Sequence, residues 1–242
     1  MRWTLGAVPT LVLWMSVLWA GCAGAQTPPE NWQNCASGRD PDTSIKACSA
    51  IIEAGKEEPE HIAGAYLDRG LSYAAKDEYQ PAIADFTQAL KLNPTLIYAL
   101  IARGDAYGET GKYDLAMADY SQAIQEQPGS ADAWNGRCFY RAVAGRLPEA
   151  LADCNEALRL RPAYTETLDS RAFVYLKMKN YDAAIADYDA ALRADPKIAS
   201  SFYGRGLAKR AKGDAAGAKT DIDTARSIDP DVASDFVRYG LE

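Results

Sequence analysis

The 242-residue sequence predicts an all-α fold, a solenoid in which antiparallel pairs of helices stack in one direction. The first observation is a proline that recurs every 34 residues, at Pro94, Pro128, Pro162, Pro196 and Pro230. The second is that a column of mostly small residues and a column of alanines keep the same period. Their members are Gly70, Gly104, Cys138, Ala172 and Gly206, and Ala82, Ala116, Ala150, Ala184 and Ala218. A fixed period of about 20 to 50 residues indicates repeats that bury their apolar faces against their neighbours.

Each unit is predicted to contain two helices that lie side by side. In the first unit, Tyr66, Gly70 and Tyr73 share one face of a first helix, and Ala82 and Phe86 share one face of a second. The small column has a packing reason, because two helices joined by a short turn approach closely only where their side chains are small.

Glycine and proline mark the boundaries of these helices. Gly111, Gly145 and Gly213 are expected at the turn inside three of the units, where the end of a helix tolerates positive φ. Pro148 is expected at the start of a second helix, where its missing N–H costs nothing. The periodic prolines disfavour helical geometry in the residue before them, so each unit is expected to end there.

The pattern W-x2-L-G-x2-Y, then A-x3-F-x2-A, then P, at this period resembles the tetratricopeptide repeat. The matching residues of the first unit are Tyr66, Gly70, Tyr73, Ala82, Phe86, Ala89 and Pro94. The resemblance implies a right-handed superhelical solenoid with about five repeats over residues 63–230. One departure is that arginine replaces the usual leucine before the small column in all five units.

That arginine column is matched by an aspartate column on the second helices. Arg69 and Asp85 flank the predicted turn almost symmetrically, so we expect a bidentate ion pair inside each hairpin. A ligand-binding ladder of charges is the alternative, but the columns share the period of the packing residues, which favours a structural role. The other predicted pairs are Arg103 with Asp119, Arg137 with Asp153, Arg171 with Asp187, and Arg205 with Asp221.

The first 25 residues read as a secretory signal peptide. An apolar stretch follows Arg2, and small residues precede a cleavage point after Ala25. The protein is therefore expected to be exported to the periplasm. A membrane anchor is the first alternative. The second is a lipoprotein acylated at Cys22, although Trp19 stands where a small aliphatic residue is usual.

Cleavage at that point leaves four cysteines, and an even number in an exported protein indicates disulfides. Cys138 and Cys154 occupy the facing small and aromatic columns of one unit, so a disulfide would fill the gap that Gly70 and Phe86 fill elsewhere. By elimination Cys35 pairs with Cys48. Zinc is disfavoured because there is no CxxC spacing and a single histidine. Two buried free thiols remain an alternative.

The ends of the stack are expected to differ from the repeats. In the N-terminal part, 26–62, residues 26–34 form a flexible lead. Residues 44–52 then form half a repeat, with the Cys35 bridge replacing the missing helix. Residues 231–242 are expected to form a capping helix, because Phe236 and Gly240 lie 34 residues after Phe202 and Gly206.

The resemblance also implies where partners bind. In this family the first helices of the units line a concave groove that holds peptides or partner helices. The corresponding residues here are Leu67, Leu71, Tyr98, Ile101, Asp105, Asn135, Phe139, Asp169, Phe173, Tyr203 and Leu207. A clamp for a C-terminal carboxylate is disfavoured, because apolar and acidic residues stand where the clamp needs lysine, arginine and asparagine; only Asn135 is similar.

Composition and motifs favour a binding scaffold over an enzyme. The formal net charge is −7, and loss of Arg2 with the signal peptide makes it one unit more negative, which argues against nonspecific nucleic-acid binding. Neither a Ser/His/Asp set nor a phosphate loop or metal cluster can be assembled around His61. We therefore expect a protein or peptide partner, no cofactor and no membrane span in the mature chain. An enzyme with an unrecognised site is the alternative of another class.

Overall fold

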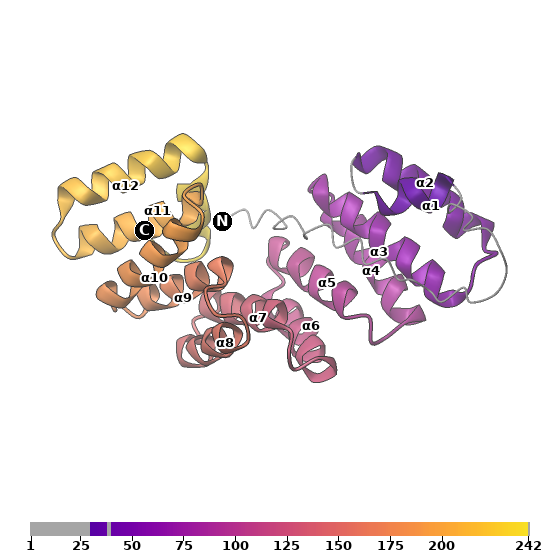
Figure 1. The fold of residues 1–242 in the computed structure, drawn as a ribbon, viewed down its shortest axis with the longest axis horizontal. Helices are drawn as coiled ribbons and strands as arrows, with labels where there is room; N and C mark the ends of the chain where they lie inside the picture. Colours follow the sequence, from indigo (N-terminus) through magenta and orange to yellow (C-terminus); the bar gives the residue numbers. More distant parts are fainter. Residues whose placement is uncertain (1–29, 38–39, 242) are drawn as a thin grey trace. The chain divides into compact units, whose positions relative to one another are not determined.

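The computed structural model describes residues 30–37 and 40–241, which form thirteen α-helices and no strand (Figure 1). The predicted signal peptide, Cys22 and residues 26–29 of the predicted lead lie outside the described residues. The described part divides into two compact units, an N-terminal unit that ends at Ala99 and a C-terminal unit that begins at Leu100.

The helices follow the predicted alternation of first and second helices. They are α1 (Glu30–Ala36), α2 (Pro41–Ala54), α3 (Pro59–Ala75), α4 (Tyr79–Leu92), α5 (Ile97–Glu109), α6 (Tyr113–Glu126), α7 (Ala131–Val143), α8 (Leu147–Leu160), α9 (Thr165–Lys177), α10 (Tyr181–Ala194), α11 (Ala199–Ala211), α12 (Ala215–Ile228) and α13 (Val232–Arg238). The predicted fold class, all-α with antiparallel helix pairs, is confirmed.

In the N-terminal unit, α3 pairs with α4, and both α1 and α2 pack against α3. The flexible lead that the sequence predicts is wrong for residues 30–34, which belong to α1. Because α1 covers α2 and buries Cys35 beside Cys48, the half repeat has a short partner helix of its own. α2 begins at Pro41 behind Asp40, whose Oδ2 accepts a hydrogen bond of 2.9 Å from the Thr43 N–H.

In the C-terminal unit, α7 pairs with α8, α9 with α10, and α11 with α12. Each second helix also packs on the first helix of the following pair, as α6 does on α7 and α8 on α9. The first helices α7, α9 and α11 contact one another in succession. Side chains on their shared side therefore form one continuous face.

The turns inside the hairpins use positive φ, as the glycine pattern predicts. Gly111, Gly145 and Gly213 have φ values of 75°, 78° and 89°. In two units no glycine stands at this turn, and Asp77 and Lys179 adopt φ values of 59° and 61° there instead. The backbone geometry is thus a property of the repeat, and glycine is the residue that adopts it with least strain.

The periodic prolines end the units as predicted. The residue before each proline closes the second helix in an extended conformation, with φ between −133° and −137°. These residues are Asn93, Gln127, Arg161, Asp195 and Asp229. A helix cannot continue through such a residue, so the chain turns into the next unit.

The small column lies at the closest approach of the two helices in a hairpin. A Cβ atom added at Gly70 would lie 2.6 Å from Cε1 of the fully buried Phe86, and one added at Gly206 would lie 2.8 Å from Cγ1 of Ile222. The column is small because the opposing second-helix side chain already fills the space.

Candidate functional site: the first-helix face and its occupant

All five predicted arginine–aspartate pairs are present, one in each hairpin. In the most buried, Arg137 Nε lies 2.8 Å from Asp153 Oδ2, and Arg137 Nη2 lies 2.9 Å from Asp153 Oδ1. The other bidentate pairs are Arg69 with Asp85, Arg103 with Asp119, Arg171 with Asp187, and Arg205 with Asp221. Each pair spans a first and a second helix, so it orients the hairpin and is separate from the side that the first helices share.

These ion pairs also alter the guanidinium groups. Hydrogen bonds to the partner aspartate raise the pKa of Arg69, Arg103, Arg171 and Arg205 above the ordinary arginine value, so all four stay charged. Asp153 accepts a further hydrogen bond of 2.6 Å from Arg141 Nη1, which places two cations on one carboxylate that is 3% exposed.

The cysteines lie in the pairs that the repeat pattern predicts. Cys35 and Cys48 have Cα atoms 4.8 Å apart, and Cys138 and Cys154 have Cα atoms 5.3 Å apart, with the sulfur atoms of each pair joined. All four are buried. Oxidation of the cysteines in the protein itself stays a prediction.

The predicted groove residues divide between the two units. In the N-terminal unit, Leu67 and Leu71 on α3 are half-buried and Tyr98 is 54% exposed. In the C-terminal unit, Ile101 and Asp105 on α5 are half-buried, whereas the remaining predicted residues are buried. Those buried residues are Asn135, Phe139, Asp169, Phe173, Tyr203 and Leu207; we call this set the first-helix face.

The aromatic members of the first-helix face form a ladder across three helices. Phe139 on α7 and Phe173 on α9 have ring centroids 5.6 Å apart. Tyr203 on α11 contacts Phe236 with a centroid distance of 4.9 Å, and Phe236 lies 6.0 Å from Phe173. The rings of the predicted groove are therefore in contact with a side chain from the end of the chain.

The polar members of this side carry perturbed carboxyl groups. Burial raises the pKa of Asp169 to about 6, and hydrogen bonds from Ser201 Oγ (2.5 Å) and Ser200 Oγ (3.2 Å) partly offset that rise. Burial also raises the pKa of Asp105 to about 7, although Tyr120 OH donates to Asp105 Oδ1 over 2.5 Å. Among the described residues, the buried Asn135 Oδ1 has no hydrogen-bond partner.

The C-terminal segment, residues 232–241, covers the first-helix face. Tyr239 is 2% exposed, and its ring centroid lies 5.1 Å from that of Phe139 and 6.3 Å from that of Phe173. Lys177 Nζ donates a hydrogen bond of 2.8 Å to the carbonyl oxygen of Tyr239. The predicted cap thus packs on α11 and α12 but also reaches α9 and α7.

The sequence pattern missed this arrangement for a local reason. The spacing of Phe236 and Gly240 predicts the first helix of a further repeat, with Gly240 inside it. Gly240 instead has φ of 80°, and α13 ends at Arg238. Leu241 N–H then bonds to the Phe236 carbonyl over 2.9 Å and Gly240 N–H to the Val237 carbonyl over 3.0 Å. This is the Schellman pattern that closes a helix at glycine.

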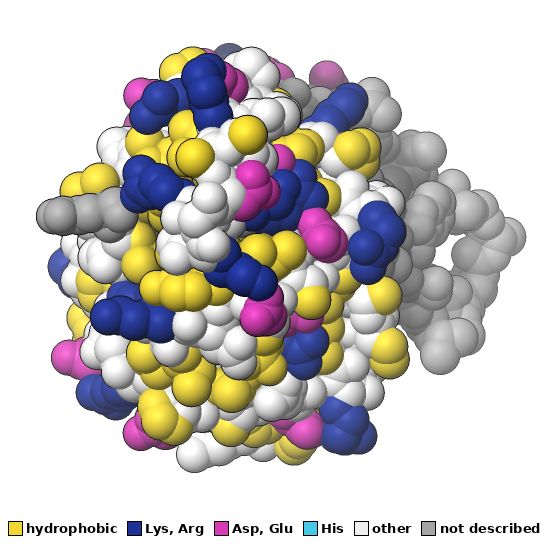
Figure 2. Space-filling view, turned by 90° about the vertical axis from the view of Figure 1, so that its left-hand side faces the viewer, with side chains coloured by type: hydrophobic (Ala, Val, Ile, Leu, Met, Phe, Trp, Pro, Cys, Tyr) yellow, Lys and Arg dark blue, Asp and Glu magenta, His cyan; other side chains and the backbone are white. Residues whose placement is uncertain are grey.

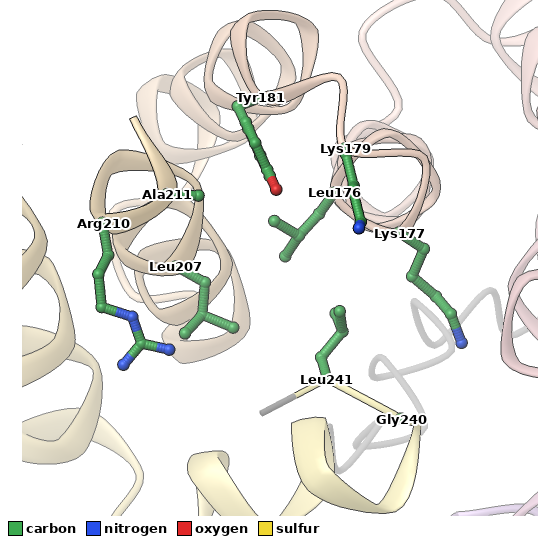
Figure 3. A pocket seen from close by; sticks show the side chains of 9 residues that line it. All are labelled: Leu176, Lys177, Lys179, Tyr181, Leu207, Arg210, Ala211, Gly240 and Leu241. Atoms are coloured by element: carbon green, nitrogen blue, oxygen red, sulfur yellow. The ribbon is translucent and has the colours of Figure 1, made fainter. Parts of the chain in front are cut away.

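A cavity of about 340 Å³ lies beside the C-terminal segment (Figure 3). Leu241 points into it between Leu176 of α9 and Leu207 of α11, and the Tyr181 ring reaches in from α10 (Figure 3). The remaining lining residues are Lys177, Lys179, Arg210, Ala211 and Gly240. The last described residue of the chain is therefore an apolar contact with the first helices.

On the side of the molecule where α11 and α12 lie in Figure 1, hydrophobic side chains are interspersed with Lys, Arg, Asp and Glu (Figure 2). Within the described residues, no group of three His, Cys, Asp or Glu side chains could hold a metal ion. Over the same residues, no helix is both long and apolar enough to cross a bilayer. His61 is exposed and lies 3.7 Å from Glu57.

The helix pairs, their repeated ion pairs and the first-helix face define a helical-repeat protein of the interaction-scaffold class. Models of the tetratricopeptide repeat match residues 63–96, 101–165 and 171–233. The chain belongs to the tetratricopeptide repeat family. Proteins of this family are typically non-catalytic scaffolds that bind other proteins.

Solved structures agree with this fold. A tetratricopeptide repeat protein from Parabacteroides merdae ATCC 43184 matches with a TM-score of 0.68 at 18% identity, over 86% of both chains. YrrB, described as a TPR protein with an unusual peptide-binding site, matches with 0.54 at 22%, over 80% of this chain and 99% of YrrB. PilW, a type IV pilus biogenesis factor, matches with 0.63 at 21%, over 69% of this chain and 77% of PilW. None of the curated proteins compared with the sequence matches it.

Proposed function

We propose that this protein is a non-catalytic scaffold of the bacterial periplasm that binds a segment of a partner protein on its first-helix face. The observation that carries the proposal is the aromatic ladder of Phe139, Phe173 and Tyr203, which already holds a short helix with aromatic side chains. A face that accommodates one such segment has the size and chemistry to accommodate another.

Polar groups on the same side support a protein ligand. Asn135 Oδ1 is buried without a partner among the described residues, and a backbone N–H of a bound segment would satisfy it. Glu109 on this side already pairs with Arg238, and Asp169 is a second carboxyl group there, which suits a segment with a basic residue. The structural similarity to YrrB, a protein with a peptide-binding site, agrees with this proposal.

Site-specific photo-crosslinking tests the proposal without disturbing the core. A benzoylphenylalanine in place of Lys179, an exposed residue that lines the cavity beside the first-helix face, should capture a small set of envelope proteins in living cells. The matched control places the same residue at Leu115, which is 48% exposed on the second helix α6. Equal capture at both positions, or none at Lys179, would contradict binding on the first-helix face.

Periplasmic location is a separate part of the proposal, and it is supported by the N-terminal sequence alone. Mass spectrometry of the mature protein should find Gln26 as the first residue. An acylated Cys22 would instead identify a lipid-anchored envelope adaptor.

A further inference from the structure

The C-terminal segment is bound by contacts from several separate helices. Phe236 is fully buried between Tyr203 of α11 and Phe173 of α9. Tyr239 packs edge-on against Phe139 of α7. Leu241 enters the cavity between α9 and α11 (Figure 3). Three apolar anchors are thus spread over three first helices.

Polar contacts fix the direction of the segment. The Tyr239 carbonyl accepts from Lys177 Nζ, and Arg238 Nη2 lies 3.4 Å from Glu109 Oε2 at the end of α5. Arg238 and Glu109 are 129 positions apart in sequence. A helix that merely covered the apolar side of the last hairpin would contact α11 and α12 only, so this reach exceeds what a cap requires.

The sequence of the segment is suited to this binding mode. The seven-residue helix α13 is too short to be stable alone, so its contacts with the first helices hold it. The turn at Gly240 sends Leu241 back along the helix toward the face that carries Phe236 and Tyr239. Val237, in contrast, is 58% exposed and contributes little to docking.

We propose that the C-terminal segment is an internal ligand that occupies the first-helix face until a partner displaces it. This proposal rests on the proposed function and names the chemistry of the partner. The partner segment carries two aromatic residues three positions apart, a basic residue just before the second, and an apolar residue two positions after it. Phe236, Arg238, Tyr239 and Leu241 present that pattern here.

Tethering sets the strength of the competition. The segment follows α12 after a short turn, so its effective concentration at the first-helix face is on the order of millimolar. A partner then binds with an apparent affinity reduced by the fraction of molecules in which the face is open. Weakening the internal anchors should raise that fraction and tighten external binding.

The test uses the full mature chain and a fluorescent peptide with the sequence of residues 230–242. Fluorescence anisotropy should show that a Phe236→Ala, Tyr239→Ala variant binds the peptide at least about tenfold more tightly than the parent, because its face is open. A Val237→Ala chain, altered at the exposed position of α13, should bind like the parent. The same peptide with both aromatic residues replaced by alanine should not bind.

A second variant keeps the proposal testable if the Phe236→Ala, Tyr239→Ala chain does not fold. Arg238→Glu keeps Phe236 and Tyr239, sets a carboxylate against Glu109 and Asp235, and removes the guanidinium that lies 4.7 Å from the Tyr239 ring centroid, so it should tighten peptide binding several-fold. Equal affinity of parent and both variants, or no binding by a folded double variant at millimolar peptide, would overturn the internal-ligand proposal. Crosslinking at Lys179 reports partner binding independently, so this failure and failure of the proposed function are distinguishable.

Discussion

At the scale of single residues, the arginine–aspartate pairs are the interactions that hold the two helices of each hairpin in a fixed orientation. Arg137 and Asp153 have side chains that are 13% and 3% exposed, and without Arg137 the desolvated Asp153 loses its bidentate partner and keeps only the hydrogen bond from Arg141. We predict that Arg137→Met lowers the free energy of unfolding by about 3 kcal/mol, measured by urea denaturation. The control is Arg159→Met, which removes an exposed pair with Glu156 and should leave the melting temperature unchanged. Equal melting of Arg137→Met and the parent would assign the pairs a role other than structural.

Asp169 should make stability depend on pH in an unusual direction. The pKa of Asp169 is about 6 in the folded state and about 4 in an unfolded chain. Between pH 4 and pH 6 the folded state therefore binds a proton that the unfolded state does not bind. Its contribution to stability is therefore present at pH 4 and is lost as the pH rises through 6. We predict that Asp169→Asn gains stability relative to the parent between pH 4 and pH 7, measured by denaturation at both pH values. An identical difference at both would contradict a buried, protonated Asp169.

Much of the residue-scale pairing could be predicted from the sequence, and the reason is periodicity. The pair of Arg137 and Asp153 recurs in every hairpin, and Cys138 and Cys154 stand at fixed positions of one hairpin, so one geometric argument places both pairs. Tyr239 lies outside the repeats, and no column predicts its contact with Phe139. The predicted groove residues are on the expected helices, but their burial by the chain itself depends on a contact between segments distant in sequence.

At the scale of helices, close approach inside each hairpin constrains one position on the first helix. Gly70→Ala would place a Cβ atom 2.6 Å from the buried Phe86 ring and should lower the free energy of unfolding by about 1–3 kcal/mol. Gly64→Ala on the same helix α3 meets no atom within 4 Å and should raise it by about 0.5–1 kcal/mol. Thermal denaturation of the two variants gives opposite signs if packing decides the small column. A shared sign would mean that helix propensity decides it.

Helix boundaries were predictable where glycine or proline marks them and not elsewhere. The turns at Gly111 and Gly145 and the ends before the periodic prolines follow directly from backbone preferences. Helix α1 has a polar sequence without periodic apolar residues, so packing against α2, and not local propensity, accounts for it. Helix α13 ends early because Gly240 adopts positive φ where the repeat pattern expects a helical residue.

At the scale of the whole molecule, export and disulfide formation are linked, because oxidising compartments keep such bonds. We predict that the mature protein, denatured without reductant, reacts with iodoacetamide at none of its four cysteines and at all four after reduction. Mass spectrometry counts the added groups. Incorporation of two groups before reduction would mean that one predicted pair is a pair of free thiols.

The repeat itself provides a graded test of the Cys138–Cys154 link. Cys138→Ala with Cys154→Ala should cost about 3 kcal/mol, because the link closes a loop with a sequence separation of 16. Cys138→Gly with Cys154→Tyr copies the pair Gly104 and Tyr120 of the preceding hairpin and should cost less. Urea denaturation compares them. Equal losses would show that the covalent link, and not the filled volume, stabilises this hairpin.

The docking of Leu241 also has a practical consequence for how the protein is purified. A single residue would separate an affinity tag fused after Glu242 from Leu241, whose side chain lies between Leu176 and Leu207. Bulky or charged additions there would weaken the contacts of Leu241 with Leu176 and Leu207. In such fusions the first-helix face would be open in a larger fraction of molecules than in the native protein. Interaction screens that use them would therefore overestimate the affinity of the protein for its partners.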